Sequence, residues 1–138
     1  MKQRERVLFT RLAIGGILAL SLGACGKFSD STFAEAPSPK PKHPWDWIPE
    51  DTSLKLGRTI YMAECNFCHN EGEEGAPSLL DREEWAERST KGEALLIRRA
   101  IDGFIGEDGE MPARGGTESL KDDEVAAAVK YMLATQQQ

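Results

Sequence analysis

The pentapeptide Cys65-Asn66-Phe67-Cys68-His69 contains the residues of this 138-residue chain whose types and spacing could do chemistry. Two thiols three positions apart, followed directly by a histidine, form the pattern of covalent haem attachment. On one helical turn each thiol can add to one vinyl group of a haem, and the imidazole can offer a neutral nitrogen to the iron. We therefore expect one haem c, bound through Cys65 and Cys68, with His69 as an axial ligand.

Two other kinds of site use the same residue types. A thioredoxin-like redox pair needs a βαβ setting, which the sequence does not indicate. A structural zinc site needs four ligands. Apart from Cys25, which has a separate explanation, the chain offers only Cys65, Cys68, His69 and the distant His43. The pattern therefore favours haem over both alternatives.

The first 25 residues have the composition of an export signal. Basic residues reach position 11, and an apolar run covers 12–22. Eleven residues at ~1.5 Å each are too short to span a hydrocarbon core of ~30 Å. The sequence Leu22-Gly23-Ala24-Cys25 resembles a bacterial lipobox, which implies cleavage before Cys25 and its acylation. We predict a signal peptide over 1–24 and a lipid anchor on the periplasmic side of the inner or the outer membrane. The alternative is an ordinary signal with an unmodified Cys25.

The segment that follows the lipidation site, up to residue 50, is rich in proline and predicts an extended tether over 25–50. Trp45 and Trp47 interrupt its polar pattern. We expect these aromatics to pack on the domain that follows; the alternative is contact with a partner or with the lipid interface. His43 is expected to be solvated.

Residues 51–138 predict one all-α domain, because apolar residues recur at helical spacing and no strand alternation is present. We expect about four helices: one over 53–65 that ends at the haem motif, one from Asp81 to Arg88, one from Thr90 that Gly103 stops, and one from near Ser119. A domain this small has a modest core. We therefore expect a haem to supply much of its apolar contact, and the form without haem to be largely unstructured.

The glycine-rich segment over 103–116 predicts a loop without regular structure, and it carries Met111 followed by Pro112. Met1 is removed with the signal, and Met62 and Met132 occupy core positions of predicted helices. Met111 is thus the candidate for the sixth iron ligand; the alternative is a loop methionine that fills the core. A thioether favours ferrous iron, so His/Met ligation raises the reduction potential relative to two nitrogen ligands.

Taken in order, the motifs resemble a class I monohaem cytochrome c, and within it the short bacterial cytochrome c-five subgroup. The resemblance covers 53–134. It rests on the haem motif, Gly75-Ala76-Pro77-Ser78-Leu79, Trp85-Ala86-Glu87-Arg88, Lys91-Gly92, Met111-Pro112-Ala113-Arg114-Gly115-Gly116 and Ala127-Ala128-Val129-Lys130-Tyr131-Met132.

This resemblance implies the cytochrome c fold, in which the first and last helices cross with Gly57 close to Tyr131. It also implies that the carbonyl of Pro77 accepts a hydrogen bond from the axial histidine. Trp85, Arg88 and Arg114 fall where the family places groups near the haem propionates; for Arg88 the alternative is a solvated helix end. Some members of the subgroup have two further cysteines where this chain has Thr117 and Ser119. That disulfide is therefore absent here.

The function that these patterns indicate is single-electron transfer rather than enzymatic catalysis. A net charge of −6 argues against nucleic acid as a partner. We expect a monomer that exchanges electrons with a redox protein donor and acceptor in a respiratory or photosynthetic chain. The alternatives are a haem subunit of an oxidoreductase complex and a haem-based gas or redox sensor with a displaceable Met111.

Overall fold

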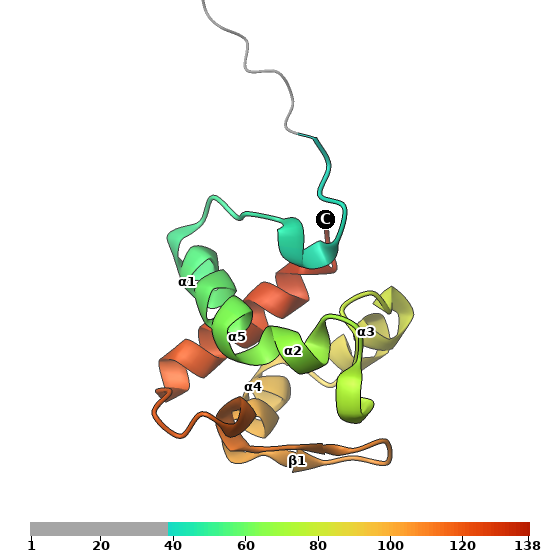
Figure 1. Cartoon of the computed structure of the whole chain (residues 1–138), viewed down its shortest axis with the longest axis vertical. Coiled ribbons are helices and arrows are strands. Elements are labelled where there is room, and N and C mark those ends of the chain that lie inside the picture. Colours follow the sequence, from blue (N-terminus) through green and yellow to red (C-terminus); the bar gives the residue numbers. More distant parts are fainter. Residues whose placement is uncertain (1–38) are drawn as a thin grey trace, which may run out of the picture. The chain divides into compact units, whose positions relative to one another are not determined.

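The computed structural model describes residues 39–138. The predicted signal peptide, the lipidation site Cys25 and the tether as far as residue 38 lie outside the described residues. The described chain is helical with one small sheet, which confirms the all-α class (Figure 1). Its elements are η1 (Pro44–Asp46), α1 (Thr52–Ile60), η2 (Tyr61–Cys65), α2 (Asn66–His69), η3 (Glu73–Gly75), α3 (Arg82–Ser89), α4 (Glu93–Asp102), β1 (Phe104–Ile105), β2 (Glu110–Met111), η4 (Ala113–Gly116) and α5 (Asp122–Thr135). Across 39–138, every helix is too short or too polar to span a membrane.

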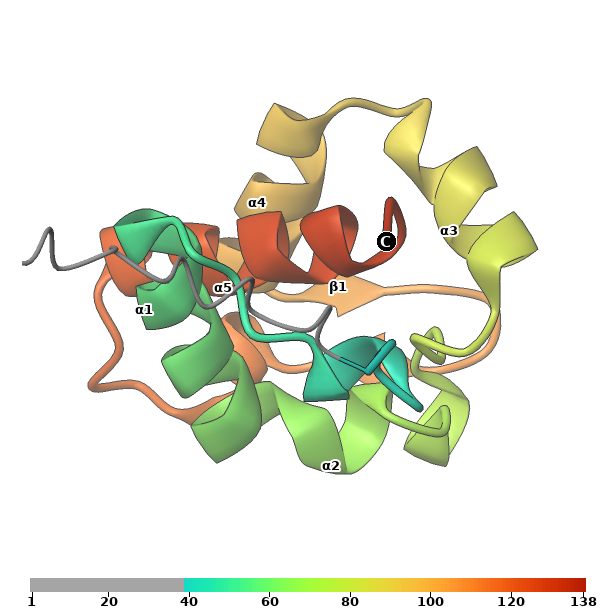
Figure 2. The ribbon, with the colours of Figure 1, turned by 90° about the horizontal axis from the view of Figure 1, so that it is seen from above.

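Helices α1 and α5 cross at the centre of the domain, and α4 packs on α5 (Figures 1 and 2). A Cβ added at Gly57 would lie 2.1 Å from the carbonyl oxygen of Ala127 and 3.0 Å from the Cβ of Tyr131. Glycine at this position therefore lets the two helix backbones touch. Tyr131 is fully buried at the crossing. The expected approach of Gly57 and Tyr131 is confirmed.

The haem motif does not end the first helix, contrary to the prediction. Helix α1 continues into η2, a turn of π-helix, and then into α2, so the chain stays helical from Thr52 to His69. A π-helical turn contains an extra residue and is often found at functional sites. Consequently the whole of Cys65–His69 lies on helical backbone.

Local hydrogen bonds decide where α3 and α4 begin. The Asp81 carboxylate accepts from the backbone N–H of Glu84 at 2.9 Å, so α3 starts as predicted. The predicted start of the next helix at Thr90 is wrong. The Thr90 hydroxyl donates to the carbonyl of Glu87 at 2.6 Å and closes α3, whereas Gly92, at a φ of +89°, precedes α4.

The last helix also begins later than predicted, at Asp122 instead of near Ser119. The backbone N–H of Leu120 donates to the carbonyl of Thr117 at 3.1 Å, so this stretch forms a separate turn before α5. Three acidic residues, Asp122 to Glu124, then occupy the first turn of α5, where the helix dipole favours negative charge.

The glycine-rich segment after α4 contains regular structure that the sequence did not indicate. Strands β1 and β2 pair antiparallel, with Phe104 opposite Met111 and Ile105 opposite Glu110. The Arg99 guanidinium lies 3.9 Å from the Phe104 ring centre and covers its face. The short hairpin thereby fixes Met111 relative to α4.

Residues 43–49, which we call the tryptophan strap, pack on the helical domain. The Trp47 ring stacks on Tyr131 with 5.8 Å between ring centres and 5° between planes. The Tyr131 hydroxyl donates to the carbonyls of Trp45 and Trp47 at 3.2 and 3.1 Å, and Arg58 Nε donates to the Trp47 carbonyl at 3.2 Å. The expectation that these aromatics pack on the domain is confirmed. His43 stacks on Trp45 at 4.8 Å.

Candidate haem site

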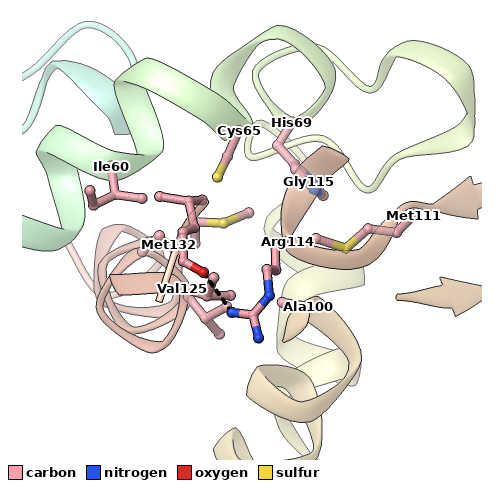
Figure 3. Close-up of a pocket in the computed structure, with 12 residues that line it drawn as sticks. Ile60, Cys65, His69, Ala100, Met111, Arg114, Gly115, Val125 and Met132 are labelled. Atoms are coloured by element: carbon pink, nitrogen blue, oxygen red, sulfur yellow. Dashed lines mark hydrogen bonds between the residues drawn. The ribbon is translucent and has the colours of Figure 1, made fainter. Parts of the chain in front are cut away.

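A pocket lies between α1, α2, α4, β2 and α5 (Figure 3). Its wall is mainly apolar and includes one imidazole, one thiol and two thioethers. The lining residues are Ile60, Cys65, His69, Ala100, Met111, Arg114, Gly115, Leu120, Val125, Ala128, Val129 and Met132.

His69 lines the pocket, and a hydrogen bond to the Pro77 loop holds its ring. The side chain is 7% exposed, and Nδ1 lies 3.0 Å from the carbonyl oxygen of Pro77. Because a carbonyl can only accept, Nδ1 carries the hydrogen and Nε2 keeps a lone pair. The backbone N–H of Leu79 donates to the His69 carbonyl at 2.7 Å, which folds the Pro77 loop back onto α2. The expected contact between His69 and Pro77 is present.

Burial is the main cause of a lowered His69 pKa, with a smaller contribution from the nearby Arg88 cation; the Pro77 hydrogen bond and Glu84 act in the opposite direction. A neutral imidazole is the form that binds metals. His69 therefore has the position, the tautomer and the charge state of a metal ligand.

The two cysteines of the motif are placed differently. Cys65 lines the pocket, whereas Cys68 does not; both are half-buried and neither is in a disulfide. Burial raises the pKa of Cys65 to about 11, and burial also raises the pKa of Cys68. Reactive redox thiols have lowered pKa values, so this setting does not favour a thioredoxin-like pair. Over 39–138, no three side chains from His, Cys, Asp and Glu gather as a metal site.

Met111 reaches the same pocket from β2, on a different element from His69 (Figure 3). The sequence therefore identified both candidate axial ligands, and the structure brings them to one cavity. Met62, by contrast, packs against the core cluster around Tyr61 and Tyr131. Met132 is buried and contributes to the wall of the pocket, although the sequence indicated only a core position.

The three residues expected near the propionates occupy different surroundings. The Trp85 indole N–H donates to the carbonyl of Ser78 at 2.8 Å, and its ring lies edge-on to His69 at 6.4 Å. Arg88 Nε donates to the Glu84 carboxylate at 2.9 Å. Of the three, Arg114 alone lines the pocket. Their contact with propionates stays a prediction.

Most of the pocket wall was not identified from the sequence as part of a site. Ile60, Leu120, Val125, Ala128 and Val129 surround the cavity. Helical periodicity indicated that several of them face inward, but it cannot distinguish contact with another helix from contact with a cofactor.

These residues fit a haem. The apolar wall suits the porphyrin. A neutral imidazole and a thioether reach the cavity from separate elements, and both are neutral ligands that suit the iron of a haem. Cys65 and Cys68, on helical backbone beside His69, have the spacing that two thioether links need.

Comparison with known proteins agrees with this assignment. Residues 52–132 match the family described as cytochrome C oxidase, cbb3-type, subunit III. The chain is 42% identical over 77 residues to cytochrome c-555 of Chlorobaculum tepidum, covering 56% of this chain and 71% of the relative. It is 32% identical over 83 residues to cytochrome c-551 of Halorhodospira halophila, covering 57% and 97%. A cytochrome c solved in an electron-transfer complex with nitrite reductase superposes with a TM-score of 0.52 and 33% identity, over 59% of this chain and 94% of that chain.

Proposed function

We propose that this chain, which belongs to the cytochrome c family that includes the cbb3-type oxidase subunit III domain, is a lipid-anchored carrier with His69 and Met111 as axial ligands. The anchor is proposed from the sequence around Cys25, and the ligands are proposed from the pocket. It has the cytochrome c fold, and it is an electron-transfer protein rather than an enzyme. It carries one haem c through Cys65 and Cys68.

The observation that carries the ligand assignment is that His69 and Met111 line one pocket from two separate elements. The haem supplies a reversible one-electron couple at its iron. The Pro77 carbonyl orients the imidazole through Nδ1 and leaves Nε2 with a lone pair. His69 and Met111 would hold the group from two elements, and the same two side chains would serve both of its charge states.

Two exposed apolar side chains support docking of a redox protein beside this pocket. Phe67, between the two cysteines on α2, is 76% exposed, and Ile105, on the strand paired with β2, is 77% exposed. The cytochrome c of the solved complex docks with nitrite reductase. For this chain we propose a redox protein donor and acceptor in a respiratory or photosynthetic chain, with the cytochrome itself monomeric.

The membrane anchor is proposed from the sequence Leu22-Gly23-Ala24-Cys25. Acyl chains on Cys25 would hold the protein on the periplasmic side of the inner or the outer membrane. The test compares the intact mass and the membrane association of the native protein with those of Cys25→Ser. We expect added acyl mass and pelleting with membranes for the native protein alone. Unmodified Cys25, or equal pelleting of both proteins, would refute the anchor.

The second candidate function is a haem subunit of an oxidoreductase complex, or a sensor, in which Met111 leaves the iron. One observation favours it: Met111 lies on a strand of only two residues, β2. Carbon monoxide added to the reduced protein distinguishes the two. Refusal or only slow binding of carbon monoxide supports the carrier, and rapid tight binding supports the subunit or sensor.

A further inference from the structure

The segment over 103–121, which we call the Met111 segment, has little structure of its own to hold it in place. Its strands have two residues each. Arg114, Gly115 and Gly116 follow one another at φ values of +56°, +65° and +87°. Met111 and Leu120 of the segment pack against the core cluster of Ala100, Val125 and Val129, and a few polar contacts add to this packing.

One side chain ties the Met111 segment to α5. Arg114 donates to the carbonyl of Leu120 at 2.7 Å and to the carboxylate of Asp122, the first residue of α5, at 2.6 Å. These bonds stabilise the left-handed backbone at Arg114, a conformation that is unfavourable for residues other than glycine. They fix the segment near the start of α5 but give it no link to the haem motif.

A second contact supplies that link. The Thr117 hydroxyl donates to the Glu64 carboxylate at 2.7 Å, across 53 positions of sequence. Glu64 directly precedes Cys65 on η2. Within the part of the chain that the structure describes, this is the only side-chain hydrogen bond that joins 61–69 to the Met111 segment.

The backbone between Thr117 and Met111 is tightly turned, so the contact can be transmitted to the methionine. The N–H of Gly115 donates to the carbonyl of Pro112 at 3.0 Å, and the N–H of Thr117 donates to the carbonyl of Arg114 at 3.2 Å. A Cβ at Gly115 would lie 3.4 Å from the Glu64 carbonyl oxygen, so the two backbones also pass in van der Waals contact.

We propose that Thr117 and Glu64 are positioning residues that hold Met111 at the pocket and thereby set how often the sixth iron position opens. This inference rests on the proposed function, because it takes Met111 as the sixth ligand. The hydrogen bond from the Thr117 side chain fastens the segment to η2.

The experiment uses purified holoprotein with Thr117→Val, which removes the hydroxyl and keeps the shape, and Thr117→Ser, which keeps the hydroxyl. Thr59→Val is the matched control, because the Thr59 hydroxyl bonds only to the Lys55 carbonyl of its own helix at 3.0 Å. The readouts are the sulfur-to-iron charge-transfer band of the ferric protein and the rate of carbon monoxide binding to the ferrous protein. We expect Thr117→Val to bind carbon monoxide about fivefold faster, because a typical net hydrogen bond changes an equilibrium constant by about that factor and this bond is solvent-exposed. Thr117→Ser and Thr59→Val should behave as wild type.

Glu64→Ala removes the same hydrogen bond from its other partner, so it tests the proposal even if Thr117→Val folds poorly. The two single variants and the double variant together form a double-mutant cycle. Both single changes should raise the rate, and the double change should add little further. Additive effects, or a wild-type rate in both single variants, would overturn the positioning role. If wild type itself lacks the sulfur-to-iron band, the proposed ligation fails and the positioning role fails with it. A normal band in wild type with unchanged variants removes the positioning role alone.

Discussion

Gly57 and Tyr131 meet so closely that a Cβ on Gly57 would stand 3.0 Å from the Cβ of Tyr131 and 2.1 Å from the Ala127 carbonyl oxygen. Gly57→Ala must push α1 away from α5, because backbone cannot move aside as a flexible side chain can. We expect a loss of about 1–3 kcal/mol in the free energy of unfolding, typical of overpacking. Denaturant unfolding of the holoprotein measures it, with the exposed Lys55→Ala on the same helix as control. Equal stability of the two variants would contradict the close crossing.

The tryptophan strap is expected to stabilise the domain. Trp47→Ala removes the ring stacked on Tyr131, and we expect a loss of about 1–3 kcal/mol, since aromatic pairs add to simple burial. Ile48→Ala is the control, because Ile48 is 68% exposed and should contribute little. Thermal unfolding and protease cleavage before residue 50 are the measurements. If Trp47→Ala has the same melting temperature and the same protease resistance as wild type, the tryptophan strap does not stabilise the domain.

The cap of α1 predicts a dependence of stability on pH. The Asp51 pKa is lowered mainly by the hydrogen bond from the Ser53 side chain, and also by the backbone N–H of Leu54. A lowered pKa in the folded state means that the charged cap stabilises above the pKa of the unfolded chain, about 3.9, and that this contribution is lost as pH falls further. Asp51→Asn keeps a capping oxygen but does not titrate. The stability difference between the two proteins should therefore shrink between pH 6 and pH 3; a constant difference would contradict the assignment.

Acidic residues surround the hairpin turn next to Met111, and we expect them to make the rate of electron transfer to charged reagents depend on salt. A Cβ on Gly75 would lie 1.9 Å from the Asp108 carbonyl oxygen, so the turn with Glu73 and Glu74 touches the turn with Asp108. The acidic turns should attract the cation hexaammineruthenium(III) and repel the anion ferricyanide. The Debye length falls from ~30 to ~10 Å as salt rises from 0.01 to 0.1 M, which weakens both effects. The reduced protein should therefore transfer its electron to hexaammineruthenium(III) more slowly at high salt, and to ferricyanide faster. Stopped-flow rates measure both.

The control for this charge effect is a pair of variants. Asp108→Asn should weaken both salt dependences, whereas Asp123→Asn, on the first turn of α5, should weaken them less. The same salt dependence for both reagents, or an equal effect of both substitutions, would show that the acidic turns do not influence electron exchange.

Parts of this structure could be predicted because a short pattern has one physical solution. Cysteines with this spacing beside a histidine specify haem attachment, and Asp81 with Glu84 three positions later marks a helix start that hydrogen bonding confirms. The family resemblance supplied the partners of two further contacts, Gly57 with Tyr131 and His69 with Pro77.

Other parts of the structure depend on competing hydrogen bonds and packing contacts, and a sequence pattern does not show which of them forms. Thr90 and Glu93 have capping-box spacing, but the Thr90 hydroxyl bonds backward to Glu87, and Gly92 supplies the positive φ before α4. The bond between Thr117 and Glu64 joins residues far apart in the chain, and nothing local signals it. Met132 follows a helical core pattern, yet its side chain borders the haem pocket, because the pattern does not say what fills the space opposite.

The central claim is that His69 and Met111 close both sides of the iron, and it is tested most directly by Met111→Ala in the purified holoprotein. The measurements are the reduction potential and carbon monoxide binding to the ferrous form. Met132→Leu is the control, because Met132 lines the same pocket but comes from α5. We expect Met111→Ala to retain its haem, to have a lower potential and to bind carbon monoxide rapidly, while wild type and Met132→Leu bind it only slowly. An unchanged potential and equally slow carbon monoxide binding in Met111→Ala would contradict the claim.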